Sequence, residues 1–278
     1  MENVKYLPLF IALFTLGCTN NVISPIKLKT TNKDYEIVVE GGLNTFQKRQ
    51  FIKLSKPAIL PGMKVQPISQ ATVNISDGNN KVFFKETDTP GVYSGIINDN
   101  RNYNRAYTLN IDYNNNHYNA SDTLRKVADI KDTDLPFSIQ VLSDGKIQLK
   151  IPRHIFYSPV SLRWLLVYPQ KNQWDPSIFK KVSYIYSHQL GSPNTLYPSI
   201  QKITTLILNP NDSVTVYKFS QSASYSTYLY NVFQETDFKN IFSSTPGRIL
   251  GNVSNNGLGY FHATDVSVKQ YLVRDFVK

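Results

Sequence analysis

The stretch ATVNISDGNNKVFFKE, from Ala71 to Glu86, decides the fold class. Its two halves alternate apolar and polar side chains, and a DGNN turn containing Asp77 and Gly78 joins them. Alternation with a period of two is typical of a half-buried strand, and Asp-Gly at the join indicates a β-hairpin. Short alternating runs bounded by turn residues recur along most of the chain. The sequence therefore predicts a mostly β protein.

The strand patterns fall into two groups. The first occupies residues 35–127, and its regularly spaced turn signals favour an immunoglobulin-like β-sandwich. The polar segment ADIKDTDLP at 128–136 ends in proline, and we interpret it as a linker. Strand patterns resume afterwards, so we expect a second β-rich domain at 137–278. Within it, RILGNVS at 248–254 is also expected to form a strand.

One segment of the second group has the period of a helix. In SASYSTYLYNVFQETDF, which begins at Ser222, apolar side chains recur at i, i+4, i+7 and i+8. These positions are Tyr225, Leu229, Val232 and Phe233. Ser222 or Ser224 can cap the first turn. We expect an amphipathic helix near 222–235.

The N-terminus carries the only cysteine of the chain, Cys18. The preceding apolar run, YLPLFIALFTLG, is too short for a membrane-spanning helix but suits a signal peptide at 1–17. A cysteine at this point resembles the bacterial lipobox, in which the thiol receives a diacylglycerol, although Thr15 stands where that motif has leucine. We expect a lipid on Cys18 and a flexible tether at 18–34. An ordinary secretory signal with an incidental cysteine is the alternative.

The chain is basic, with a formal net charge of +10. Its Lys and Arg residues are scattered, and no recognition helix or RNA-binding signature occurs. We therefore expect no nucleic-acid partner. The charge is interpreted as an aid to solubility and to attraction by an acidic lipid or glycan surface.

The sequence offers no recognisable catalytic or cofactor motif. The four histidines are far apart and none has metal-ligand spacing. They are His117, His154, His188 and His262. We expect no catalytic residue, no metal and no cofactor, although a carboxylate pair brought together by the fold would suit a hydrolase.

Two further motifs have alternative interpretations. The carboxylates of the linker, including Asp132, suit Ca²⁺ as hard oxygen ligands, but a solvated linker is the simpler interpretation. GLGYF at 257–261 lacks the lysine and the capped helix of a phosphate-binding loop. We predict a bend or bulge there, where the backbone packs closely.

Aromatic residues are the positive feature of the composition, with 18 Tyr, 15 Phe and 2 Trp. Tyr184 and Tyr186 share one face of a predicted strand, and Trp174 and Tyr197 lie in the flanking loops. Tyr and Trp offer large contact area at low entropic cost, which suits a glycan or peptide ligand. These four residues are the candidate ligand-binding set. The alternative is that they are ordinary half-buried residues of a β protein.

Five stretches of the chain together carry a family resemblance. They are YEIVVEGGL, PISQATVNISDGNNKVFFKETDTPGVYSG, AYTLNIDYNNNHYNASDTL, DSVTVYKFSQSASYSTYLYNVFQ and TPGRILGNVSNNGLGYFHATDVS. In this order they resemble the DUF4249 family, lipoproteins of Bacteroidetes with no assigned activity. The resemblance covers nearly all of the chain after the signal peptide. It implies an outer-membrane lipoprotein associated with a TonB-dependent receptor, and it supplies no catalytic residues.

From these observations we expect a non-enzymatic, lipid-anchored binding protein of the outer membrane that works with a TonB-dependent transporter in nutrient capture or uptake. The periplasmic or surface face is left open. One alternative is an adhesive or structural envelope lipoprotein without a transporter. Another is a glycan or peptide hydrolase.

Overall fold

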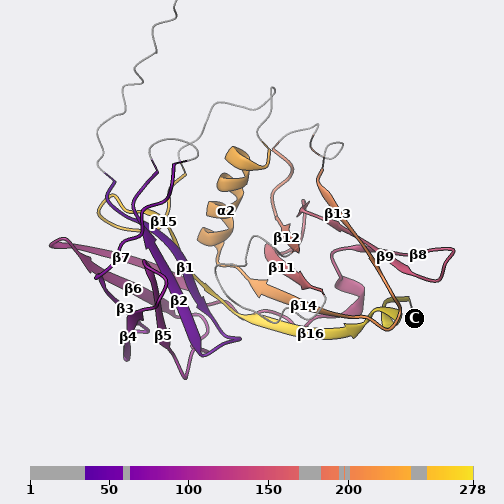
Figure 1. Cartoon of the computed structure of the whole chain (residues 1–278), viewed down its shortest axis with the longest axis horizontal. Coiled ribbons are helices and arrows are strands. Elements are labelled where there is room, and N and C mark those ends of the chain that lie inside the picture. The colour runs from indigo at the N-terminus through magenta and orange to yellow at the C-terminus, as the bar shows by residue number, and fades with distance from the viewer. Residues whose placement is uncertain are drawn as a thin grey trace, which may run out of the picture. The chain divides into compact units, whose positions relative to one another are not determined.

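The computed structural model describes residues 35–58, 63–168, 183–193, 197, 201–238 and 249–277. Within these ranges the protein is mostly β, with three sheets and a single α-helix (Figure 1). Residues from Asp34 onward form one compact unit. The predicted signal peptide and tether, with Cys18, lie outside the described residues. No helix in the described ranges is long and apolar enough to cross a membrane.

The first sheet has eight strands in the order β15-β1-β2-β5-β4-β3-β6-β7. Their bounds are β1 (Val38–Asn44), β2 (Arg49–Ser55), β3 (Thr72–Ser76), β4 (Lys81–Glu86), β5 (Val92–Ile96), β6 (Ala106–Tyr113), β7 (Asn116–Thr123) and β15 (Leu258–Thr264). The decisive hairpin is β3–β4, which turns at Gly78 with φ +94°. The mostly β class and its immunoglobulin-like sandwich are thus confirmed.

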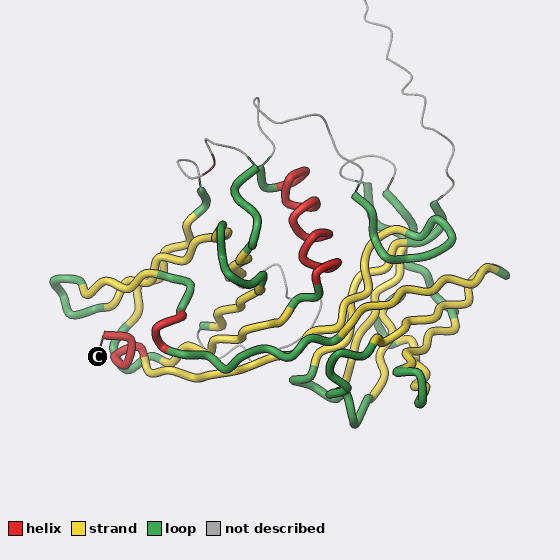
Figure 2. The backbone as a smooth tube through the Cα atoms, turned by 180° about the vertical axis from the view of Figure 1, so that it is seen from behind, coloured by secondary structure: helices red, strands yellow, loops and turns green. Residues whose placement is uncertain are grey.

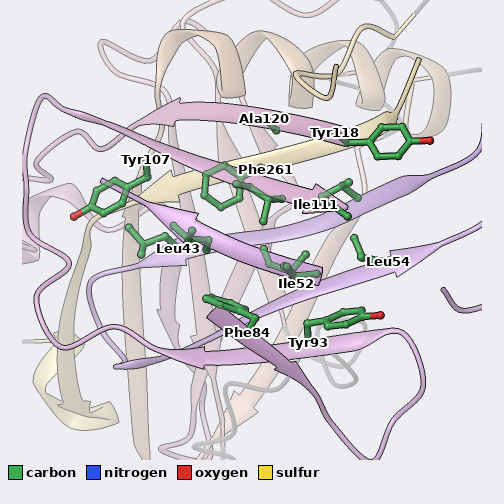
Figure 3. Close-up of a cluster of buried hydrophobic side chains, with 14 of the residues drawn as sticks. Leu43, Ile52, Leu54, Phe84, Tyr93, Tyr107, Ile111, Tyr118, Ala120 and Phe261 are labelled. Carbon is green, nitrogen blue, oxygen red and sulfur yellow. The ribbon is translucent and has the colours of Figure 1, made fainter. Parts of the chain in front are cut away.

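The core of this sandwich follows from the alternation along each strand. In β2, Ile52 and Leu54 are buried while Lys53 between them is only half-buried. Figure 3 shows these side chains meeting Phe84 and Tyr93 between the strands. Full burial of one large apolar side chain stabilises the fold by roughly 1.5–3 kcal/mol, so this cluster dominates the local energetics.

The second β region contains two smaller sheets. Their orders are β10-β12-β11-β14-β16 and β13-β9-β8. The bounds are β8 (Ser138–Val141), β9 (Ile147–Pro152), β10 (His154–Ile155), β11 (Leu162–Val167), β12 (Ser183–Ser187), β13 (Ile203–Leu208), β14 (Ser213–Ser220) and β16 (Val266–Leu272). Trp164, Ile185 and Leu149 belong to one buried cluster that both sheets share. Short 3-10 helices occupy Asp132–Asp134 and Val273–Val277.

The C-terminal strands serve both regions. β15 pairs in parallel with β1 of the first sheet, whereas β16 pairs antiparallel with β14 of the second. Asp265 alone separates the two strands. A strand from the C-terminal part of the sequence thus completes the N-terminal sheet, while the proposed linker at 128–136 stays a prediction.

The helix α2 (Ala223–Thr236) confirms the predicted segment. Ser222 caps it by accepting a hydrogen bond from the Tyr225 N–H at 3.0 Å. In Figures 1 and 2, α2 stands between the first sheet and the strands of the second. Its ring contacts reach both sides, through Tyr225 to His262 of β15 and through Phe233 to Tyr186 of β12.

The GLGYF prediction is confirmed, whereas the strand expected for RILGNVS is wrong. Gly259 has φ +89° and lies so close to the Val39 carbonyl that a Cβ would clash. In the described part of RILGNVS, residues 249–254, only an isolated bridge from Val253 to Ala120 forms. The Asn252 side chain instead bonds the Phe261 backbone, accepting from its N–H and donating to its carbonyl. A side chain thus replaces a strand ladder at this position.

Candidate functional site

Three of the four predicted ligand-binding residues lie in the described part of the chain, and Trp174 lies outside it. Tyr184 and Tyr186 share one face of β12, as their spacing predicts, and their rings stack at 6.2 Å. Both side chains are half-buried. Tyr197 is buried, and its ring meets Phe238 at 4.6 Å. Tyr186 and Tyr197 pack against α2 through Phe233, whereas Tyr184 faces Arg163 of β11.

Beside these tyrosines lies a polar group, here called the histidine cluster: Arg153, His154, His188 and Asp237. His154 Nδ1 is 3.0 Å from His188 Nε2, and His154 Nε2 is 2.9 Å from an Asp237 carboxylate oxygen. Arg153 Nε donates to the same oxygen at 3.2 Å. β10 and β12 pair in parallel, which brings the histidines together, and Asp237 follows the last turn of α2.

The hydrogen bonds of the histidine cluster fix its tautomers. The Asp237 carboxylate only accepts, so His154 carries its proton on Nε2 and accepts at Nδ1. His188 therefore donates from Nε2. Burial lowers the pKa of His154, against the opposing effect of Asp237. Burial, together with His154, lowers the pKa of His188 to about 4, so both rings are neutral at pH 7.

The histidine cluster holds α2 to the sheet. The hydrogen bond from His154, with Arg153 beside it, lowers the pKa of Asp237 to about 2. His154 has no exposed surface and both of its ring nitrogens are engaged. A general base must reach a substrate proton, so this geometry suits an anchor between sheet and helix better than acid–base catalysis.

A second group surrounds Arg163 of β11, and we call it the arginine site: Arg163, Tyr184, Phe219, Tyr225 and His262. In the strand register, Arg163 lies opposite Phe219 of β14 and Tyr186 of β12. Its guanidinium carbon is 4.5 Å from the Phe219 ring centre and 5.9 Å from that of Tyr184. Tyr225 of α2 and His262 of β15 face the same charge and stack on each other at 4.7 Å.

Arg163 has no hydrogen bond or ion pair with any residue in the described ranges, and its Nε is inaccessible. An uncompensated ion of this kind costs several kcal/mol. Contacts with aromatic faces return only about 0.5–2 kcal/mol. Within the described residues, the ring contacts therefore do not offset the cost of burying this charge.

The neighbours of Arg163 are uncharged at neutral pH. Burial raises the pKa of Tyr184 to about 12, against the opposing charge of Arg163. Burial also raises the pKa of Tyr225. His262 is affected in the opposite direction, since burial and the charge of Arg163 lower its pKa to about 3. The site thus carries one positive charge and several neutral rings.

The acidic groups that approach these rings are engaged elsewhere. The charge of Asp237 helps to raise the pKa of Tyr186, but its carboxylate is hydrogen-bonded to Arg153 and His154. The charge of Asp122 helps to raise the pKa of Tyr225. The Asp122 carboxylate accepts a hydrogen bond from the Ala263 N–H at 2.9 Å, and burial raises the pKa of Asp122 itself. Neither forms an ion pair with Arg163.

The comparison with protein families finds a match over most of the chain. The family described as a domain of unknown function (DUF4249) matches residues 23–270. The chain belongs to the DUF4249 family. The match spans both β regions and α2, so the arginine site and the histidine cluster of this DUF4249 protein both lie within it. No curated protein matches the chain.

Sequence reasoning missed the central residues of both groups. Nothing in the local pattern around His154 and His188 predicts their contact, because it arises from the pairing of β10 with β12. Arg163 did leave a signal: it is the single charged residue in the apolar strand SLRWLLVY. A charge inside a strand that is buried on both faces requires a partner, and no described residue supplies one for Arg163.

Asp132 of the predicted linker is hydrogen-bonded to two side chains of β16. It accepts hydrogen bonds from Lys269 Nζ at 2.5 Å and from the Tyr271 hydroxyl at 2.8 Å. No group of three His, Cys, Asp or Glu side chains in the described residues is placed to hold a metal ion. Asp132 thus tethers the segment before the second region to β16.

Proposed function

We propose that the protein is a lipid-anchored binding protein of the outer membrane that captures a ligand and passes it to a TonB-dependent transporter. The observation that carries the binding role is the arginine site. A cation without a counter-charge, held between aromatic rings, costs stability, and such costs are typical of sites kept for ligands. The Cys18 motif and the family resemblance support the anchor and the partner.

The anchor is tested by replacing its thiol. We expect the full chain to incorporate labelled palmitate in its native host and to fractionate with the outer membrane. Cys18→Ser should abolish labelling and release the chain from the membrane, since a signal without the thiol leaves no acylation site. A parent protein that carries no label and leaves the membrane in the same way as Cys18→Ser would instead favour an ordinary secretory signal with an incidental cysteine.

The partner is tested by purification from the native outer membrane in mild detergent, followed by mass spectrometry of co-purifying proteins. A TonB-dependent barrel at near-equal amount is the expected result. Tagged Cys18→Ser serves as the matched control for adventitious capture. A lipidated protein that emerges alone would contradict the transporter role and favour an adhesive or structural envelope protein.

A further inference from the structure

Arg163 differs from Arg153, an arginine between β9 and β10 that also lies near an aromatic ring. Arg153 also lies near a tyrosine, 5.5 Å from the Tyr186 ring centre, but its charge is matched by Asp237. Arg163 has ring contacts alone among the described residues. Among the described residues, the fold thus supplies a counter-charge for Arg153 and none for Arg163.

The surroundings of Arg163 suit an incoming anion. Arg163 is half-buried and its Nε is inaccessible, so the two terminal nitrogens of the guanidinium are the ones left to meet an anion. Its planar fork matches the two oxygens of a carboxylate or phosphate. The tyrosine hydroxyls beside it remain protonated at neutral pH and are able to donate hydrogen bonds. The Phe219 ring adds an apolar surface.

We propose that Arg163 is the anion-binding residue of this protein, and that the captured ligand carries a carboxylate or phosphate group. The inference rests on the proposed binding function and names the chemistry of its ligand. The anion supplies the missing counter-charge. The neighbouring rings of Tyr184 and Phe219 contact the rest of the ligand.

The test uses the full-length chain in a nonionic detergent, with thermal unfolding followed by tryptophan fluorescence at pH 7.5. Sodium citrate or sodium phosphate replaces sodium chloride at constant ionic strength. We expect either probe to raise Tm by about 3–6 °C once it exceeds its Kd tenfold. Micelles doped with phosphatidylglycerol form a third arm. A rise there, without one in free phosphate, would identify a lipid headgroup as the source of the anion.

Substitutions at Arg163 decide the assignment. In Arg163→Met the rise should disappear, while Tm in chloride stays equal or increases because an unpaired charge has been replaced by an apolar side chain. Arg163→Lys keeps the charge without the fork, so a smaller rise is expected. The matched control, Arg153→Met, should lower Tm in chloride and keep the full rise.

Two results would overturn the proposal: an undiminished rise in Arg163→Met, or no rise in the parent protein with citrate, phosphate or the doped micelles. Both are independent of the co-purification experiment. A protein that binds anions through Arg163 but purifies without a barrel refutes the transporter partnership alone. A protein that purifies with a barrel but shows no anion response refutes the ligand chemistry alone.

Discussion

This protein buries histidine side chains in their neutral form, whereas it keeps the charge of an arginine side chain. His188 and His154 are kept neutral and paired with each other, so burial costs them little. Arg163 cannot lose its proton and therefore carries its charge into the same sheet. The histidines thus stabilise the fold at neutral pH, and the arginine is the residue that we propose for ligand binding.

The first prediction concerns acid stability at His188. Its pKa is about 4 in the folded protein against an ordinary value of 6.5, so the unfolded chain binds the proton more readily. The stabilisation is complete above pH 6.5 and is lost as the pH falls from 6.5 to 4. The full loss is roughly 3 kcal/mol. His188→Gln keeps a donor for His154 without titrating, and urea unfolding at pH 7.5, 5.5 and 4 should show a shallower decline.

Because His154 and His262 also have lowered pKa values, both proteins should still lose stability in acid. The contribution of His188 is the difference between the two declines. Equal declines in the parent and in His188→Gln would refute a buried, neutral His188.

At the residue scale, sequence patterns predict burial well and contacts poorly. Alternation correctly places Tyr184 and Tyr186 on one face of a strand, because side-chain direction is a local property. The contact between His154 and His188 depends on a parallel pairing of β10 with β12, which β11 separates in the sequence, and no local period encodes it. Arg163 is intermediate, since its strand predicts burial but not the absence of a counter-charge.

At the scale of the element, α2 is the part that the sequence specifies most completely. Its apolar face, its cap and its length are all set within its own residues. Its two ends are fixed differently: Ser222 satisfies the first turn, and Asp237 joins the last turn to His154. The helix therefore spans the arginine site at one end and the histidine cluster at the other.

The second prediction concerns the cap of α2. Ser222→Ala removes the acceptor for the Tyr225 N–H and should reduce the free energy of unfolding by about 1 kcal/mol. Thr227→Ala, on the exposed face of the same helix, is the matched control and should cost little. Urea unfolding measures both. Equal effects of the two changes would mean that Ser222 does not act as the cap.

β15 shows the limit of prediction at this scale. Its strand character is visible in LGYFHATDVS, but its partner is β1, more than 200 positions earlier in the chain. The sequence indicated close backbone packing at GLGYF, and the structure identifies Val39 as the neighbour of Gly259. Parallel strands need long connections, so their partners cannot be inferred from hairpin signals.

At the scale of the whole molecule, Asp265 joins the two β regions. Its carboxylate accepts hydrogen bonds from the Thr45 hydroxyl at 2.6 Å and the Val127 N–H at 2.9 Å, both from the first region. Its own N–H donates at 2.8 Å to the hydroxyl of Ser220, at the end of β14. One buried residue between β15 and β16 thus contacts both regions, the first through its side chain and the second through its backbone N–H.

The third prediction follows from this junction. Asp265→Ala leaves the Thr45 and Val127 donors buried without acceptors, which should cost roughly 2–5 kcal/mol in the free energy of unfolding. Asp88→Ala, in an exposed turn of the first region, is the control and should change stability by less than about 0.5 kcal/mol.

Because β15 and β16 are almost continuous, we expect the parent protein to unfold in one transition when monitored by circular dichroism and by tryptophan fluorescence. Two separate transitions would show that the regions on either side of 128–136 unfold independently, and Asp265 would then be a local contact with no role in coupling them.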